Sequence, residues 1–261
     1  MQLSRAWASF NLGHLNFGQL AWVVIALVSV TSIAHASIQI PKNLSQSDQQ
    51  QMLRIIGLGM SEKLLSDPYP LGGYSGFEVG IAVENLPTDD LARLGSKLTT
   101  PQADITYPKL TLGKGIYNDI DIFLEFTPYR RADELTQFGG IVRWGFYQGQ
   151  LFPFSASLLA HANSANTSNL LTSRTYGVDL MAGVSVSQIS VFGGLGFIQS
   201  IGTFTGGVNG ITASGLTTEE SVSALHTFVG ANLRLFKVAF VAVQLDRTEV
   251  PVVSGKVGFR F

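Results

Sequence analysis

The stretch that decides the fold is Val253-Ser254-Gly255-Lys256-Val257-Gly258-Phe259-Arg260-Phe261, the last nine residues of the printed chain. Apolar or small residues occupy its odd positions, and polar, charged or small residues occupy its even positions. Successive side chains of a β-strand point to opposite faces of the sheet, so this pattern predicts a strand with one apolar and one polar face. An edge strand of a soluble domain can show the same pattern, so the rest of the chain has to decide the class of protein.

The N-terminal region has the features of an export signal. Arg5 is the only charged residue before an apolar run over residues 20–33, and Ala34-His35-Ala36 places small residues where signal peptidase cleaves. A run of about 14 apolar residues is short for a transmembrane helix and suits a signal peptide. We therefore predict a signal peptide over residues 1–36 and a mature chain that begins at Ser37.

Composition narrows the class of the mature protein. The chain has no cysteine, which excludes disulfides and thiolate metal sites, and its net charge of -1 argues against nucleic acid as a partner. Only 13% of the residues are charged. A chain this poor in charge is either a soluble β protein with a large core or a barrel whose apolar face lies in lipid. The sequence predicts no cofactor and no metal site.

Residues 37–72 follow a helical pattern rather than a strand pattern. Ser45-Gln46-Ser47-Asp48 indicates a helix start, and Pro68-Tyr69-Pro70 ends the region. Apolar residues recur at helical spacing between them: Met52, Leu53, Ile56, Met60, Leu64 and Leu65. The sequence leaves three interpretations of this segment open: a periplasmic helix, a partial plug in the lumen of a barrel, or a poorly ordered lead-in.

From residue 73 to residue 261 the period of the pattern is two. Ten strands are predicted, over residues 74–84, 106–113, 120–127, 138–147, 152–162, 175–185, 189–198, 223–234, 238–246 and 253–261. The apolar faces of these strands carry no charged residue. The physical reason in a membrane is that Arg or Lys facing lipid near the midplane costs about 2–4 kcal/mol.

The connections between these strands alternate in length. Longer polar loops are predicted around residues 85–105, 128–137, 163–174 and 199–222. Short turns are predicted around residues 114–119, 148–151, 186–188 and 235–237, and only the connection at 247–251 breaks the alternation. Long outer loops and short periplasmic turns are typical of outer-membrane barrels. We predict an all-β fold: a closed antiparallel transmembrane β-barrel of about ten strands, with eight or twelve as alternatives, and both termini on the periplasmic side.

The closing strand resembles that of Gram-negative outer-membrane β-barrel proteins. In that family a terminal Phe, with apolar residues at alternate positions before it, is the signal that the assembly machinery reads, and Val257, Phe259 and Phe261 match it. The resemblance identifies no subfamily. It implies location in the cell outer membrane, contact with outer-membrane lipid and lipopolysaccharide, and assembly by the barrel assembly machinery and periplasmic chaperones.

Inward positions of the predicted strands carry charges of both signs in nearly equal number. Small barrels have interiors that side chains can fill, whereas wide channels need about 16–18 strands. The sequence leaves open a paired core that stiffens the barrel and a narrow porin-like passage for small solutes. A surface adhesin acting through the outer loops is an alternative. The predicted lumen charges are Glu78, Lys109, Asp121, Glu125, Arg143, Asp179, Arg234, Lys256 and Arg260, with Glu84 and Asp246 near the rim.

A barrel hydrolase, either a protease or a lipid-modifying enzyme, is the competing function. His161 and His226 are the only histidines after residue 36, and with Asp246 they are the catalytic candidates. The stretch His161-Ala162-Asn163-Ser164 is similar to the His-x-Ser-Asn stretch of lipid A deacylases, with Ser and Asn transposed. A histidine near the rim is more often a polar filler than a catalytic base, so the sequence favours no enzymatic activity.

Overall fold

A computed structural model describes residues 39–97, 104–128, 135–149 and 153–261. The signal peptide predicted over residues 1–36 lies outside these residues, as do parts of two predicted loops and one predicted turn. Among the described residues, no helix is both long enough and apolar enough to cross a lipid bilayer.

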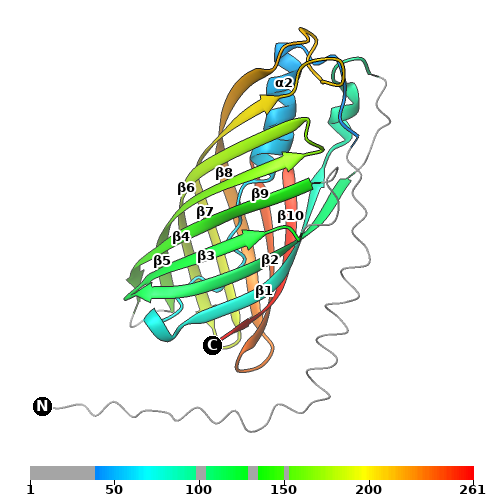
Figure 1. Cartoon of the computed structure of the whole chain (residues 1–261). Coiled ribbons are helices and arrows are strands. Elements are labelled where there is room, and N and C mark those ends of the chain that lie inside the picture. The colour runs from blue at the N-terminus through cyan, green and yellow to red at the C-terminus, as the bar shows by residue number, and fades with distance from the viewer. Residues whose placement is uncertain (1–38, 98–103, 129–134, 150–152) are drawn as a thin grey trace, which may run out of the picture. The chain divides into compact units, whose positions relative to one another are not determined.

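The described residues form ten antiparallel strands that close into a barrel (Figure 1), so the predicted fold class and strand number are confirmed. Each strand pairs with its neighbours in chain order, and the first pairs with the last. The strands are β1 (Phe77–Pro87), β2 (Asp104–Tyr117), β3 (Ile120–Phe126), β4 (Leu135–Gln148), β5 (Phe154–Thr167), β6 (Leu171–Val186), β7 (Ile189–Phe204), β8 (Thr218–Arg234), β9 (Ala239–Arg247) and β10 (Pro251–Arg260).

The strand pattern at the end of the chain closes the barrel against β1. Val79 lies opposite Phe259 and Ile81 lies opposite Val257. Beyond the last paired strand residues, Phe77 and Phe261 exchange two backbone hydrogen bonds, with N–O distances of 3.0 and 2.8 Å, and their rings stack with centroids 6.5 Å apart. Every described strand therefore has two neighbours, and β2 over 104–109 and β8 over 218–226 extend past their shorter neighbours β3 and β9.

Two of the long loops are shorter than predicted. Residues 163–174 are not a loop: β5 runs to Thr167 and β6 begins at Leu171, so that a three-residue turn joins them. Likewise β7 and β8 extend into the region 199–222, which leaves a loop over 205–217. The outward faces of these strand ends carry polar residues such as Ser164 and Arg174, so the outward apolar pattern ends while the backbone pairing continues.

One inward assignment in β4 is wrong. Alternation continued along the strand from the inward Arg143 predicts that Tyr147 faces the lumen. The register shifts between Trp144 and Tyr147, however, and Tyr147 is 52% exposed. A β-bulge of this kind adds a residue to one strand, which reverses the alternation beyond it. Tyr147 packs instead against Phe154, with ring centroids 5.8 Å apart.

Residues 44–71, which we call the lumenal segment, run inside the barrel from the end with the longer loops to the end with the short turns. At the long-loop end, Leu44 N donates to Ile211 O at 2.7 Å, and Ser96 N donates to the neighbouring Lys42 O at 2.9 Å. At the short-turn end, Arg234, the last residue of β8, contacts Asp67. The first described residues therefore lie at the long-loop end and β10 finishes at the short-turn end, so the two ends of the described chain are not on the same side of the barrel as predicted.

The lumenal segment begins with α2 (Gln46–Met52) and continues into a π-helical turn, η1 (Leu53–Gly57). The predicted helix start is confirmed as a capping box: Ser45 and Asp48 each accept a hydrogen bond from the backbone N–H of the other. Two short 3-10 turns, η2 (Gly73–Ser75) and η3 (Asp89–Arg93), flank β1.

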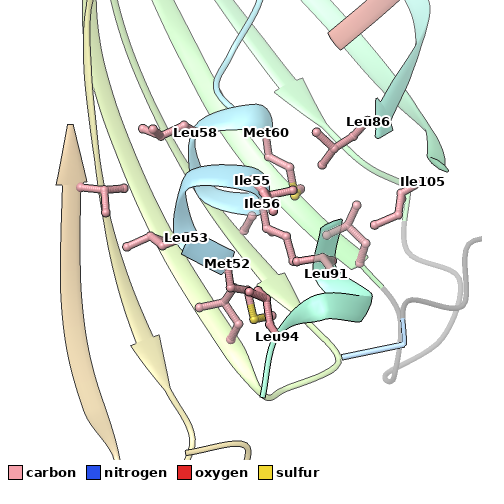
Figure 2. Close-up of a cluster of buried hydrophobic side chains, with 14 of the residues drawn as sticks. Met52, Leu53, Ile55, Ile56, Leu58, Met60, Leu86, Leu91, Leu94 and Ile105 are labelled. Atoms are coloured by element: carbon pink, nitrogen blue, oxygen red, sulfur yellow. The ribbon is translucent and has the colours of Figure 1, made fainter. Parts of the chain in front are cut away.

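The main apolar core lies inside the long-loop half of the barrel. Figure 2 shows side chains of the helical turns meeting side chains from β1, β2 and η3. Met52, Leu53 and Ile56 are fully buried there, as is Leu86 of β1. The apolar side chains of the lumenal segment thus pack against the inward apolar side chains of the barrel wall to form this core.

Candidate functional site

Between this apolar core and the short-turn end, the lumen is lined by charged side chains. The residues predicted to carry lumen charges all lie at inward positions, and most of them are buried. Arg234 and Arg260 differ because they sit at the short-turn end, where their side chains are 46% and 20% exposed. The buried members are Glu78, Glu84, Lys109, Asp121, Glu125, Arg143, Asp179, Asp246 and Lys256.

Lys109 of β2 is surrounded by three carboxylates. Its Nζ lies 2.9 Å from Glu84 Oε1, 3.5 Å from Glu62 Oε2 and 3.6 Å from Glu125 Oε2. Lys63 Nζ lies 2.9 Å from the other oxygen of Glu84. Glu84, which the sequence predicts near the rim, is buried in this lysine cluster.

A second group of ion pairs lies toward the short-turn end. Arg143 Nε donates to Asp121 Oδ2 at 2.9 Å, and its Nη1 donates to the backbone oxygen of Asp67 at 2.7 Å. Lys256 Nζ lies 2.8 Å from Glu78 Oε1. The bond to Asp67 O ties the wall to the lumenal segment, whereas the two ion pairs join β4 to β3 and β10 to β1.

The two histidines and two aspartates form a third cluster. His161 Nε2 lies 3.1 Å from Asp179 Oδ2, and His226 Nδ1 lies 2.9 Å from Asp179 Oδ1. On its other side, His226 Nε2 lies 3.1 Å from Asp246 Oδ1, which also accepts a hydrogen bond from Gln244 Nε2 at 2.7 Å. All five residues are buried.

Strand register explains why these residues meet. On β7, Gly196 lies opposite Asp179 of β6 and also opposite His226 of β8. A Cβ at Gly196 would lie 2.2 Å from Asp179 Oδ1, so the absence of a side chain there lets the two residues meet across β7. On β6, the absence of a side chain at Gly177 likewise leaves room for the ring of His161, whose Nε2 would lie 2.3 Å from an added Cβ.

The deacylase-like stretch does not assemble a hydrolytic site. His161 faces the lumen, whereas Ser164 is on the opposite face of β5 and is exposed. Asn163 faces inward, where its side-chain amide donates to the backbone oxygen of Met60. The serine and the histidine of this stretch therefore lie on opposite sides of the barrel wall.

A cavity of about 350 Å³ opens at the short-turn end of the barrel. Its lining includes Arg234, Lys237 and Arg260, together with Asp67 and the terminal Phe261. Arg234 Nη2 lies 2.5 Å from Asp67 Oδ2, and Arg260 donates to the backbone oxygen of Tyr69 at 2.8 Å. The basic side chains of this cavity are therefore held largely by the lumenal segment.

Sequence reasoning missed the site residues on the lumenal segment. Glu62, Lys63 and Asp67 belong to a region whose helical spacing gave no sign of which polar residues face the barrel wall. Tyr107 and Gln244 could have been found from the sequence, because both occupy inward-facing positions of predicted strands. Tyr107 donates its hydroxyl to Glu84 Oε2 at 2.6 Å.

Comparison with known proteins finds only distant matches among solved structures. No protein-family model matches the chain, and no curated protein sequence matches it. Among solved structures, Ail, the attachment invasion locus protein of Yersinia pestis, is 13% identical with a TM-score of 0.31, over 71% of this chain and 97% of Ail. Ail in complex with the heparin analogue sucrose octasulfate gives 13% identity and a TM-score of 0.29 over the same shares of the two chains. Neisserial surface protein A (NspA) is 10% identical with a TM-score of 0.29, over 71% of this chain and 95% of that one.

Proposed function

We propose that the protein is an integral outer-membrane β-barrel of a Gram-negative cell envelope with a structural role, and that its own lumenal segment closes its lumen. The observation that carries this proposal is the inverted distribution of side chains. Charged and polar residues are buried inside the barrel, and large apolar residues face outward around it.

The outward apolar belt matches a lipid environment. Phe197 is 73% exposed and Phe138 is 60% exposed, and both belong to a belt contributed by all ten described strands. Soluble monomers rarely expose contiguous apolar patches of more than a few hundred Å². Exposed outward charges in the described strands occur only near strand ends, at Asp104, Lys114, Arg174, Glu219 and Arg247.

The belt and the connection lengths together suggest an orientation. We place the long-loop end outside the cell and the short turns in the periplasm, as is typical of outer-membrane barrels. The partners of this proposal are outer-membrane lipid and lipopolysaccharide, with the barrel assembly machinery and periplasmic chaperones acting through Val257, Phe259 and Phe261.

Hydrogen bonds from most of the wall support a closed lumen. Gln137 of β4 donates to Met60 O at 2.9 Å, and Thr175 of β6 donates to Gly57 O at 3.0 Å. Contacts to Glu62, Lys63 and Asp67 come from β1, β2, β7 and β8. A segment held from so many sides leaves little room for an aqueous channel, so we favour a structural role over an open porin.

Two measurements on the full mature chain test this proposal. Purification should require detergent, and the folded protein should migrate differently on a gel before and after heating. In planar bilayers it should give no discrete conductance steps under conditions in which an open porin, measured in parallel, conducts.

The outcomes separate the candidate functions. A mature chain that purifies as a monomer without detergent contradicts the membrane assignment. A heat-modifiable barrel with regular conductance steps would leave the membrane assignment intact and establish the narrow porin-like passage instead.

A further inference from the structure

We propose that His161, Asp179 and His226 form a binding site for a divalent transition-metal ion inside the barrel, and that Asp246 orients His226 for this role. One nitrogen from each histidine and one carboxylate oxygen lie within 4.8 Å of one another. The three residues come from β5, β6 and β8, so the closed sheet rather than a loop holds them in place.

The distances between the donor atoms suit a metal ion after small side-chain movements. With metal–ligand bonds of about 2.0–2.1 Å, ligands of a tetrahedral Zn²⁺ lie roughly 3.3 Å from each other. The two imidazole–carboxylate distances are 3.1 Å at His161 and 2.9 Å at His226. A modest rotation of the side chains would let the ion sit between groups that now touch.

His161 is the observation that points to a missing ligand. Its side chain is only 2% exposed. Its Nε2 lies 3.1 Å from Asp179 Oδ2, whereas its buried Nδ1 makes no hydrogen bond. A buried polar group without a partner is costly, and an imidazole nitrogen facing a carboxylate and a second imidazole is a ready metal ligand.

Asp246 supplies the support that metal-bound histidines usually have. His226 directs Nδ1 to the proposed site, and its Nε2 lies 3.1 Å from Asp246 Oδ1. Gln244 in turn donates to Asp246 at 2.7 Å. A carboxylate that accepts the second ring N–H of a ligating histidine fixes the tautomer and orientation of the ring.

Charge balance also favours a divalent ion. The carboxylates of Asp179 and Asp246 carry a charge of -2 when ionised, which one divalent cation neutralises. Two imidazoles and a carboxylate suit zinc and its neighbours better than magnesium or calcium, which prefer oxygen ligands.

Zinc binding to the full mature chain tests the site. The chain, carrying no polyhistidine tag, is refolded into detergent in the presence of Zn²⁺, freed of loose metal by gel filtration, and assayed for metal by mass spectrometry. Zinc is supplied during refolding because the lumen is closed in the folded state. The expected result is one zinc ion per folded wild-type chain.

Matched variants locate the metal. His161→Gln and Asp179→Asn should reduce bound zinc to background, and Asp246→Asn should weaken binding by roughly 10–100-fold. Glu78→Gln is the control, because Glu78 is an equally buried lumen carboxylate that pairs with Lys256 instead. It should keep its zinc. Heat-modifiable migration shows which variants have folded.

A measurement on the wild type alone tests the site even if the variants do not fold. X-ray absorption at the zinc edge should show two imidazole ligands and at least one oxygen ligand. The proposal is overturned if the folded wild type retains no zinc, if folded His161→Gln retains as much as the wild type, or if the spectrum shows no imidazole.

Discussion

At the scale of single residues, the lumen is an arrangement of buried charges that depend on one another. Lys109 is the clearest case, because Glu62, Glu84 and Glu125 all approach its ammonium group within 3.6 Å. Burying a charge is costly unless the charge is paired, so removing one partner leaves the others uncompensated. Each of these side chains therefore matters more to folding than a surface charge does.

Replacing Lys109 should test that dependence. We expect Lys109→Met to lower the free energy of unfolding by about 3–5 kcal/mol, because three carboxylates are left with Lys63 as the nearby cation. Urea unfolding in detergent micelles, followed by tryptophan fluorescence, measures the change.

The control for this substitution is Arg93→Met. Arg93 forms an exposed pair with Asp90 at 3.2 Å, with side chains 83% and 56% exposed, and such pairs contribute about 0–1 kcal/mol. Equal effects of the two substitutions would show that the Lys109 cluster contributes no more than a surface pair.

The sequence could place these charges but could not pair them. Alternation along a strand assigns Lys109 and Glu84 to the inward face, because the parity of a strand is a local property. Glu62 and Lys63, which complete the cluster, lie on the lumenal segment, whose helical spacing says nothing about which strand it touches.

At the scale of elements, the fit between the barrel wall and the lumenal segment depends on inward positions without side chains. Gly183 of β6 is one example: a Cβ there would lie 2.5 Å from Pro68 Cβ and 2.7 Å from Pro68 Cγ. Gly139 of β4 is another, with Glu62 Oε1 at 2.2 Å from an added Cβ. The high glycine content of the strands thus has a packing reason.

A substitution at Gly183 should loosen this fit. We expect Gly183→Val to lower the free energy of unfolding by about 1–3 kcal/mol, since the added methyl groups collide with the rigid ring of Pro68. Gly255→Val is the matched control in β10, because the nearest atom to its added Cβ, Ala242 O, lies 3.9 Å away.

Both variants can be compared by the temperature at which the folded form disappears from heat-modifiability gels. If Gly183→Val loses its folded form at the same temperature as Gly255→Val and the wild type, the lumenal segment does not pack against β6 as described.

At the scale of the whole molecule, the path of the chain has a consequence for cell topology. The described chain starts at the long-loop end, passes through the lumen and enters β1 at the short-turn end, where β10 also finishes. Under the proposed orientation, the first described residues, from Gln39 onward, lie outside the cell.

An epitope inserted immediately before Gln39 should therefore bind antibody on intact cells. The matched control is the same epitope inserted between Ser187 and Gln188, in a short turn at the other end of the barrel, which should bind antibody only after the outer membrane is permeabilised. The reverse labelling would contradict the proposed orientation.

The sequence by itself determined the strands, their two faces and the barrel class, because alternation and the exclusion of charge from outward-facing positions are properties of each strand alone. It also indicated the helix start at Ser45. It failed where strands continued without an outward apolar face and at the bulge before Tyr147. Only the tertiary structure decided that the lumenal segment threads the barrel, which charges pair, and that His161, Asp179 and His226 meet across Gly196. Those outcomes depend on register between distant strands and on the space left inside a closed wall, which no single stretch of sequence contains.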